Sequence, residues 1–106
     1  MGRFVIVAYT PKPGRESDLL ALVRKHLRIL EKEGLVTERP AHVMRASNGA
    51  VIEVFEWRSA DAIQTAHGNA AVQALWGEFG AVCDYTPLAN LEESRQMFAE
   101  FEALEL

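Results

Sequence analysis

The chain has 106 residues, a length typical of one domain that buries a core without crosslinks. Its 49% apolar and 25% charged residues exclude a disordered chain, and its formal charge of −4 argues against a dedicated nucleic-acid binder, which would carry a basic surface. Cys83 is the single cysteine, so no internal disulfide can form, and we expect a small buried side chain in a reducing compartment.

The first predicted element is a strand over Arg3–Thr10, which is rich in β-branched and aromatic residues and is closed by the breaker Pro11-Lys12-Pro13-Gly14. Its apolar run is too short for a signal sequence or a membrane span, so we expect a cytoplasmic protein without a membrane partner. Both faces of the strand are apolar, with Phe4, Ile6 and Ala8 on one and Val5, Val7 and Tyr9 on the other. Such a strand is expected to be covered on both sides.

The next elements are a helix and a hairpin. Apolar spacing predicts the helix over Arg15–Lys32, and Gly34 is expected to end it. Pro40–Ser47 and Ala50–Arg58 have the composition of strands and are joined by Asn48-Gly49. Because a type I′ turn requires positive φ at both central residues, this dipeptide predicts a tight hairpin.

The second half of the chain predicts two short helices, a strand and a last helix. Ser59 and Asn69 are expected to cap the two short helices. Asp84–Leu91 suits an edge strand, because Pro87 cannot donate to a ladder. Within Glu92–Leu104, an apolar stripe predicts an amphipathic helix that stabilises a dimer. The stripe consists of Met97, Phe101 and Leu104.

The order β-α-β-β-α-β with a trailing helix predicts a single α+β domain over residues 1–106. This is the ferredoxin-like split βαβ arrangement with a four-stranded antiparallel sheet. Two helices cover only one face of such a sheet, and 106 residues leave nothing to cover the other face. A second copy packed sheet to sheet is the economical solution, so we expect the protein to be its own partner in a homodimer.

Four segments carry a family resemblance: the strand ending Val54-Phe55-Glu56-Trp57, the helix capped by Ser59, the pair Ala66-His67, and the helix from Val72 to Trp76. Through them, the chain resembles the antibiotic-biosynthesis-monooxygenase-like proteins over about residues 3–90. The resemblance implies a dimeric α/β-barrel whose ligand lies in a cleft between the sheet and the helices of each protomer. It implies neither a metal nor a cofactor.

The resembling family includes cofactor-independent monooxygenases that act on aromatic polyketides or quinols, heme-degrading enzymes, and members without known activity. Members often carry a Glu on the third strand and a His eleven residues later, and Glu56 and His67 keep that spacing. The resemblance therefore implies that these two residues are catalytic. If Trp57 is the alignment anchor instead, Ala66 takes the place of that His. The heme-degrading members match less well, because Trp76 stands where they carry the axial His.

Two histidines have more than one interpretation from the residues alone. In the last turn before Gly68, His67 complements the helix dipole and can donate to free carbonyls, or else it lines the cavity. His26 falls within the apolar stripe of its helix, where its ring must find a backbone or water partner or face a polar-lined cavity.

Two acidic residues on the third strand also need partners. Glu56 would form an acid/base pair with His67 if the two were buried side by side. Glu53, on the opposite face of the strand, is expected to pair with Arg45 across the hairpin.

The sequence supports two classes of function. In the first, the chain is a cofactor-independent monooxygenase that acts on an aromatic or quinone-like compound. Its site would consist of two catalytic residues, His67 and Glu56, and four substrate-binding residues, His26, Trp76, Trp57 and Tyr85. In the second, it is a non-catalytic ligand-binding or structural homodimer, and the aromatic residues form core. The three histidines have no short-spaced metal motif, so we expect no metal site.

Overall fold

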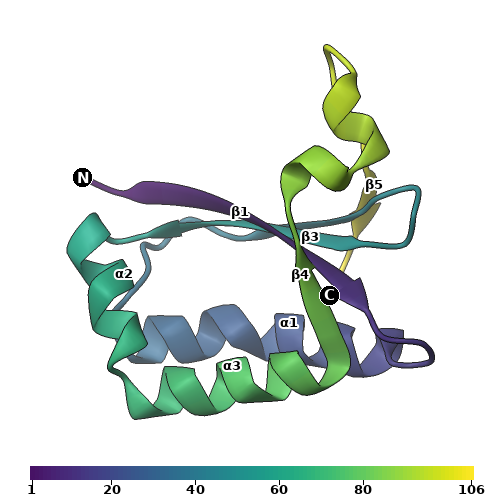
Figure 1. Cartoon of the computed structure of the whole chain (residues 1–106). Coiled ribbons are helices and arrows are strands. Elements are labelled where there is room, and N and C mark those ends of the chain that lie inside the picture. Colours follow the sequence, from purple (N-terminus) through teal and green to yellow (C-terminus); the bar gives the residue numbers. More distant parts are fainter.

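The structure is a computed structural model that describes residues Met1–Leu106. A five-stranded sheet carries three helices on one face, and the C-terminal segment rises from its other side (Figure 1). The strands are β1 (Arg3–Pro11), β2 (His42–Arg45), β3 (Val51–Trp57), β4 (Cys83–Thr86) and β5 (Glu102–Leu104). The helices are α1 (Glu16–Lys32), α2 (Ala60–His67) and α3 (Ala70–Val82), and none of them is long and apolar enough to cross a membrane.

All neighbouring strands in the sheet are antiparallel, and their order is β4-β1-β3-β2-β5. The four predicted strands are present, and β4 lies at an edge as expected. The strand predicted over Asp84–Leu91 is shorter than expected, because β4 ends at Thr86, before Pro87. Along β1 and β3, Val7 lies opposite Glu53 and Phe4 lies opposite Glu56. Because side chains alternate along a strand, Glu53 faces the helices together with Val7, whereas Glu56 faces away from them together with Phe4.

The helices begin and end where local capping dictates. The Ser59 hydroxyl accepts a hydrogen bond from the backbone N–H of Ala62 at 3.1 Å, and the Asn69 side chain accepts one from Val72 at 3.1 Å. Both predicted caps are therefore confirmed. Gly34 follows α1 with a φ of 73°, a left-handed conformation that ends a helix at low cost for glycine.

The main core lies between the sheet and the two long helices, α1 and α3, which run beneath it (Figure 1). Leu19 of α1 and Phe79 of α3 have no exposed surface, and Tyr9 of β1 packs with them. Cys83 belongs to the same cluster and is buried, as expected. A second cluster around Leu30 continues the core towards α2.

The helix predicted over Glu92–Leu104 is wrong. The segment instead contains one 3-10 turn, η2 (Glu92–Arg95), followed by β5, which pairs with β2. Another 3-10 turn, η1 (Leu88–Asn90), precedes it. Met97, expected to be buried, is 93% exposed. Pairing of β5 with β2 provides hydrogen-bond partners for backbone groups that a helix would otherwise have satisfied. Leu91 is buried against the sheet, and the Glu93 carboxylate accepts a hydrogen bond from the backbone of Ser47 at 2.8 Å.

The turn predicted at Asn48-Gly49 also differs. Gly49 has a φ of 90°, but no non-glycine residue has positive φ, so Asn48 does not adopt the type I′ conformation. The N–H of Gly49 donates to the carbonyl of Ala46 at 3.0 Å, and the N–H of Ala46 donates to the carbonyl of Ala50 at 2.9 Å. This pattern is that of a three-residue loop in which a turn is followed by a left-handed glycine.

The sheet face that points away from the helices is only partly covered. Ile52 and Ala8 are buried there beneath Leu91 of the C-terminal segment. Phe4 and Ile6, at the other end of β1, are 58% and 49% exposed. Apolar surface on β1 therefore remains open to solvent in the single chain.

Candidate functional site

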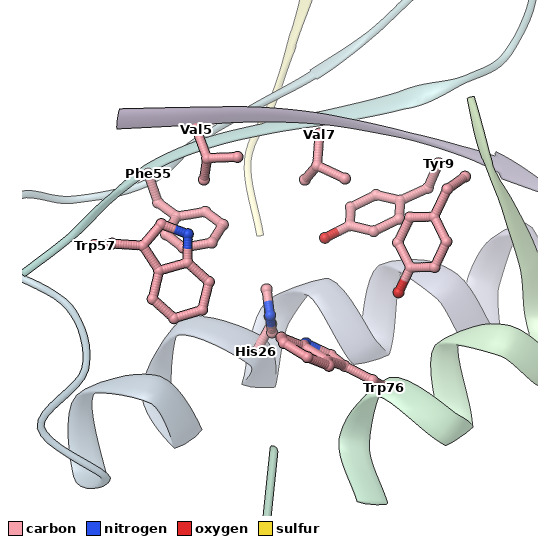
Figure 2. Close-up of a pocket in the computed structure, with 8 residues that line it drawn as sticks. Val5, Val7, Tyr9, His26, Phe55, Trp57 and Trp76 are labelled. Atoms are coloured by element: carbon pink, nitrogen blue, oxygen red, sulfur yellow. The ribbon is translucent and has the colours of Figure 1, made fainter. Parts of the chain in front are cut away.

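A cavity of about 380 Å³ lies between the sheet and the helices. Seven of its eight lining residues are hydrophobic, and His26 is the exception. The cavity is lined by Val5, Val7, Tyr9, His26, Phe55, Trp57, Trp76 and Tyr85. Figure 2 shows Val5 and Val7 pointing down from β1, while His26 rises from α1 and Trp76 reaches in from α3. Its volume falls in the range of about 300–1,000 Å³ that is usual for small-molecule sites.

The four residues predicted to bind substrate all line this one cavity. His26 comes from α1, Trp57 from the end of β3, Trp76 from α3 and Tyr85 from the edge strand β4. Four separate elements thus bring them together. Their role in substrate binding stays a prediction, but the structure places all four side chains around the same cavity.

The polar centre beside the cavity is a contact among three buried side chains of β1, α1 and β3. Oε1 of Glu53 lies 2.7 Å from the hydroxyl of Tyr9, which donates to it, and 2.9 Å from Nδ1 of His26. Glu53 is 1% exposed and His26 is 4% exposed. Buried polar groups of this kind are stable only when they satisfy one another. The expected pairing of Glu53 with Arg45 is wrong, because Arg45 binds Glu16 and Glu102 instead.

Aromatic side chains hold the ring of His26 in place. Phe55 and Phe79 meet it edge-on, with ring centroids 5.4 Å and 5.2 Å away. Tyr9 in turn stacks on Phe79 at 5.0 Å. The orientation of the imidazole is therefore fixed by packing on its faces and by Glu53 at Nδ1.

Burial raises the pKa of the Tyr9 hydroxyl well above its ordinary value of 10.0, and the negative charge of Glu53 raises it further. Tyr9 therefore stays protonated and remains a hydrogen-bond donor. Burial also raises the pKa of Tyr85, with smaller contributions from Cys83 and Glu53. Both phenols of the cavity wall are neutral at neutral pH.

Two atoms of the buried network have no hydrogen-bond partner: Nε2 of His26 and Oε2 of Glu53. His26 lines the cavity, whereas Glu53 does not. Because Glu53 occupies Nδ1, the ring nitrogen of His26 that remains free is Nε2. An unpaired buried polar atom costs about 1–3 kcal/mol unless a partner arrives.

The structure does not bring Glu56 and His67 together. Glu56 lies on the opposite face of the sheet, where its carboxylate accepts a hydrogen bond from the Thr37 hydroxyl at 2.8 Å and meets Nε of Arg39 at 2.8 Å. His67 is exposed at the end of α2, and its Nδ1 lies 2.8 Å from the carbonyl oxygen of Ile63. The acid/base pair is therefore not formed, and His67 makes the contact expected of a helix cap.

His67 nevertheless stays close to the cavity wall. Its ring meets that of Trp76 edge-on, with centroids 5.2 Å apart, but His67 itself does not line the cavity. A catalytic role for Glu56 or His67 stays a prediction. The contacts observed for both are with residues outside the cavity, apart from Trp76.

The sequence interpretation missed the partner of His26. Two signals pointed to it: an imidazole within the apolar stripe of a helix, and an acid flanked on its own strand face by Val51 and Phe55. Each polar group needed a buried partner, and each satisfies the other. Tyr9 carried no polar signal, because an aromatic residue on a two-sided apolar strand is usually core.

The arrangement provides a largely apolar, aromatic cavity, and Nε2 of the wall residue His26 is a buried polar atom without a partner. No group of three or more His, Cys, Asp or Glu side chains is placed to hold a metal ion. The cavity walls suit a flat ring system, and Nε2 of His26 suits a hydroxyl or N–H group on that ring.

The fold is shared with a solved structure. The structure of Rv0793 from Mycobacterium tuberculosis is similar to this chain with a TM-score of 0.63 and 21% sequence identity. The likeness covers 89% of this chain and 99% of that protein. The sequence matches no protein-family model and no curated protein. At this level of identity the likeness establishes a common small α+β fold and nothing about activity.

Proposed function

We propose that this protein binds a flat aromatic or quinone-like small molecule in the cavity between its sheet and its helices. The observation that carries the proposal is the lining: apart from His26, every side chain on the wall is apolar or aromatic. Trp57 and Trp76 offer ring faces against which a planar compound can stack. When an aromatic ligand fills this cavity, apolar surface of the ligand and of the cavity wall is removed from water, which favours binding.

The chemistry proposed for the bound compound is oxygenation without a cofactor, in keeping with the resemblance to the antibiotic-biosynthesis-monooxygenase-like proteins. Such a reaction needs an electron-rich substrate, a group that accepts its proton, and exclusion of water. We propose that the buried imidazole of His26 accepts the proton and that the apolar wall limits the access of water. For an anthrone, the methylene carbon would lose two hydrogens and gain one oxygen atom from O₂, and the other oxygen atom would leave as water.

The protomer is proposed to be ferredoxin-like and to pair with a second copy as a dimeric α/β-barrel. The four strands β4-β1-β3-β2 have the order of that fold, and β5 extends the sheet at the side of β2. Phe4 and Ile6 leave apolar surface open on the face that such a dimer would cover. Met97 and Phe98 add exposed apolar side chains on the segment beside it.

Calorimetric titration with β-naphthol tests the binding proposal. The wild type is expected to bind it, and Trp76→Ala is expected to bind at least about tenfold more weakly, because one wall of the cavity is lost. Phe98→Ala is the matched control, since Phe98 is exposed and lies outside the cavity. Absence of binding, or equal losses in both variants, would overturn the proposal.

Oxygen uptake with anthrone tests the reaction. We expect one O₂ consumed for each anthraquinone formed, and no protein-dependent uptake with Trp76→Ala at the same anthrone concentration. If β-naphthol binds but anthrone is not oxygenated, the result favours the second candidate function, a non-catalytic ligand-binding homodimer. The separation of Glu56 from His67 is the observation that favours this second candidate.

A further inference from the structure

We propose that Nε2 of His26 accepts a hydrogen bond from a hydroxyl group of the bound aromatic ring. Glu53 and Tyr9 position His26 for this contact. The cavity therefore selects aromatic hydroxy compounds. The inference rests on the proposed function, because it assigns a polar contact to a ligand of that same cavity. It names His26 as the residue that contacts the ligand and aromatic hydroxy compounds as the substrate class. It also assigns the tautomer of His26 that makes this contact possible.

The hydrogen-bond geometry assigns the tautomer of His26. The hydroxyl of Tyr9 donates to Oε1 of Glu53 at 2.7 Å, which marks that oxygen as an acceptor. Nδ1 of His26 lies 2.9 Å from the same oxygen, so the ring donates its Nδ1 hydrogen there. In the neutral ring, Nε2 then carries the lone pair and acts as an acceptor.

The position of His26 leaves that lone pair to a ligand. Nε2 is buried and has no partner in the protein, and His26 is the one polar residue on the cavity wall. Figure 2 shows His26 pointing from α1 towards the sheet, and Trp57, Tyr9 and Trp76 line the same cavity. A ring stacked on these indoles can therefore place a hydroxyl near Nε2.

The tyrosines of the wall differ from His26. Tyr85 is 56% exposed, so water can satisfy its hydroxyl whether or not a ligand binds. The hydroxyl of Tyr9 is already committed to Glu53 as a donor. A ligand without a hydrogen to give, such as a methyl ether, would bury Nε2 unsatisfied and could place only its own lone pairs there. We expect the contrast between donor and non-donor ligands to come from this buried acceptor atom, because it has no other partner.

When the ligand ionises, the proton passes along the same hydrogen bond. The O–H bond of the ligand breaks, the Nε2–H bond of His26 forms, and the electron pair stays on the ligand oxygen. The carboxylate of Glu53 stabilises the imidazolium at Nδ1, as the carboxylate of a hydrolase triad does. Glu53 does not line the cavity, so it acts only through His26.

A pair of probes that differ only at the hydroxyl tests the proposal: β-naphthol and its methyl ether. Titration calorimetry on the wild-type protein is expected to give at least about tenfold tighter binding of β-naphthol. In nitrogen NMR with isotope-labelled histidine, the Nε2 resonance of His26 is expected to shift with β-naphthol and to stay in place with the ether.

Variants separate selectivity from folding. The double leucine variant His26→Leu/Glu53→Leu is made together with Tyr9→Phe, because Tyr9 lines the cavity and its hydroxyl would otherwise lose its partner Glu53. Both probes are then expected to bind with affinities within about threefold of each other. Glu53→Gln keeps the shape but removes the charge behind the ring, so the preference for β-naphthol is expected to fall while binding of the ether is retained. His42→Leu, an exposed histidine outside the cavity, is the control and is expected to keep the full preference.

The outcomes distinguish this inference from the proposed function. Equal affinity of the wild type for both probes, or an unmoved Nε2 resonance with bound β-naphthol, overturns the inference but leaves an aromatic-binding cavity. Failure of both probes to bind overturns the proposed function as well. A preference that survives in the variant combining these three changes assigns the hydroxyl contact to another residue and overturns the role of His26.

Discussion

His26 and Glu53, which are 27 residues apart in the sequence, touch in the interior with 2.9 Å between Nδ1 and Oε1. The contact ties the middle of α1 to the middle of β3. It buries an acid and an imidazole beside a largely apolar cavity, so we expect it to affect both stability and the proposed ligand binding.

Removal of one partner of this contact is expected to be costly. His26→Leu leaves Glu53 buried with Tyr9 as its single remaining donor, so the free energy of unfolding is expected to fall by about 3 kcal/mol or more. His26→Leu/Glu53→Leu removes the buried acid and imidazole and leaves only the Tyr9 hydroxyl unpaired, so its loss is expected to be smaller, about 1–3 kcal/mol. Urea denaturation measures both values. A double variant as unstable as the single one would contradict the account.

Tyr9→Phe keeps the ring that stacks on Phe79 and removes only the hydroxyl donated to Glu53. Hydrogen bonds to charged groups contribute about 1.5–3 kcal/mol, so a loss of that size is expected in urea denaturation at neutral pH. Tyr85→Phe is the matched control, because Tyr85 is 56% exposed and its hydroxyl has no hydrogen bond within the chain. Equal losses in the two variants would show that the bond to Glu53 is not what stabilises the fold.

The same hydroxyl predicts a pH dependence in alkali. The pKa of Tyr9 is raised in the folded protein above its ordinary value of 10.0, so the unfolded chain releases this proton first and unfolding becomes easier as the pH rises past 10.0. The stability gap between the wild type and Tyr9→Phe is therefore expected to narrow by about 1.4 kcal/mol for each pH unit above that value. A constant gap would contradict burial of the hydroxyl.

The C-terminal segment contains both a buried side chain, Leu91, and exposed ones such as Phe98. Leu91→Ala is expected to cost about 2–5 kcal/mol, because Leu91 is 1% exposed and packs against the sheet. Phe98→Ala is expected to leave the stability of the single chain within about 0.5 kcal/mol, since Phe98 is 82% exposed. Thermal unfolding of dilute samples measures both. A large loss for Phe98→Ala would mean that this side chain is covered in solution.

The open face of the sheet predicts the oligomeric state. Ile6→Lys places a charge on the face that a second copy is proposed to cover, so sedimentation is expected to show a folded monomer where the wild type is a dimer. Leu106→Lys makes the same chemical change near α1 and is the control, expected to remain dimeric. A wild type that sediments as a monomer would contradict the proposed dimer.

Much of the fold could be predicted because local rules decide it. The two-residue alternation of β1 and β3 separates Val7 and Glu53 from Phe4 and Glu56, and the pairing confirms this division. The caps at Ser59 and Asn69 follow from one side chain each. Elements of this kind need no knowledge of distant partners.

The C-terminal segment could not be predicted in the same way. Met97, Phe101 and Leu104 have helical spacing, but the segment forms β5 at the open edge of β2 instead. Its structure depends on an edge strand that lies more than fifty residues earlier in the chain. A periodic pattern in a short segment cannot reveal that competition.

The sequence predicted residues that line the cavity but not the buried contact of His26 with Glu53. Trp57, Trp76 and Tyr85 were expected around a ligand, and they do share one cavity with His26. The contact of His26 with Glu53 depends on how α1 lies over β3, which spacing along the chain does not encode. The pairing of Glu56 with His67 rested on family spacing, and strand alternation places Glu56 on the other face.

The central claim is that the cavity receives an aromatic hydroxy compound at His26. A crystal structure of the protein grown with β-naphthol tests it most directly. The account predicts the ring system between Trp57 and Trp76, with its oxygen within hydrogen-bond distance of Nε2 of His26. An empty cavity at saturating β-naphthol, or a bound ring whose oxygen points away from His26, would contradict it.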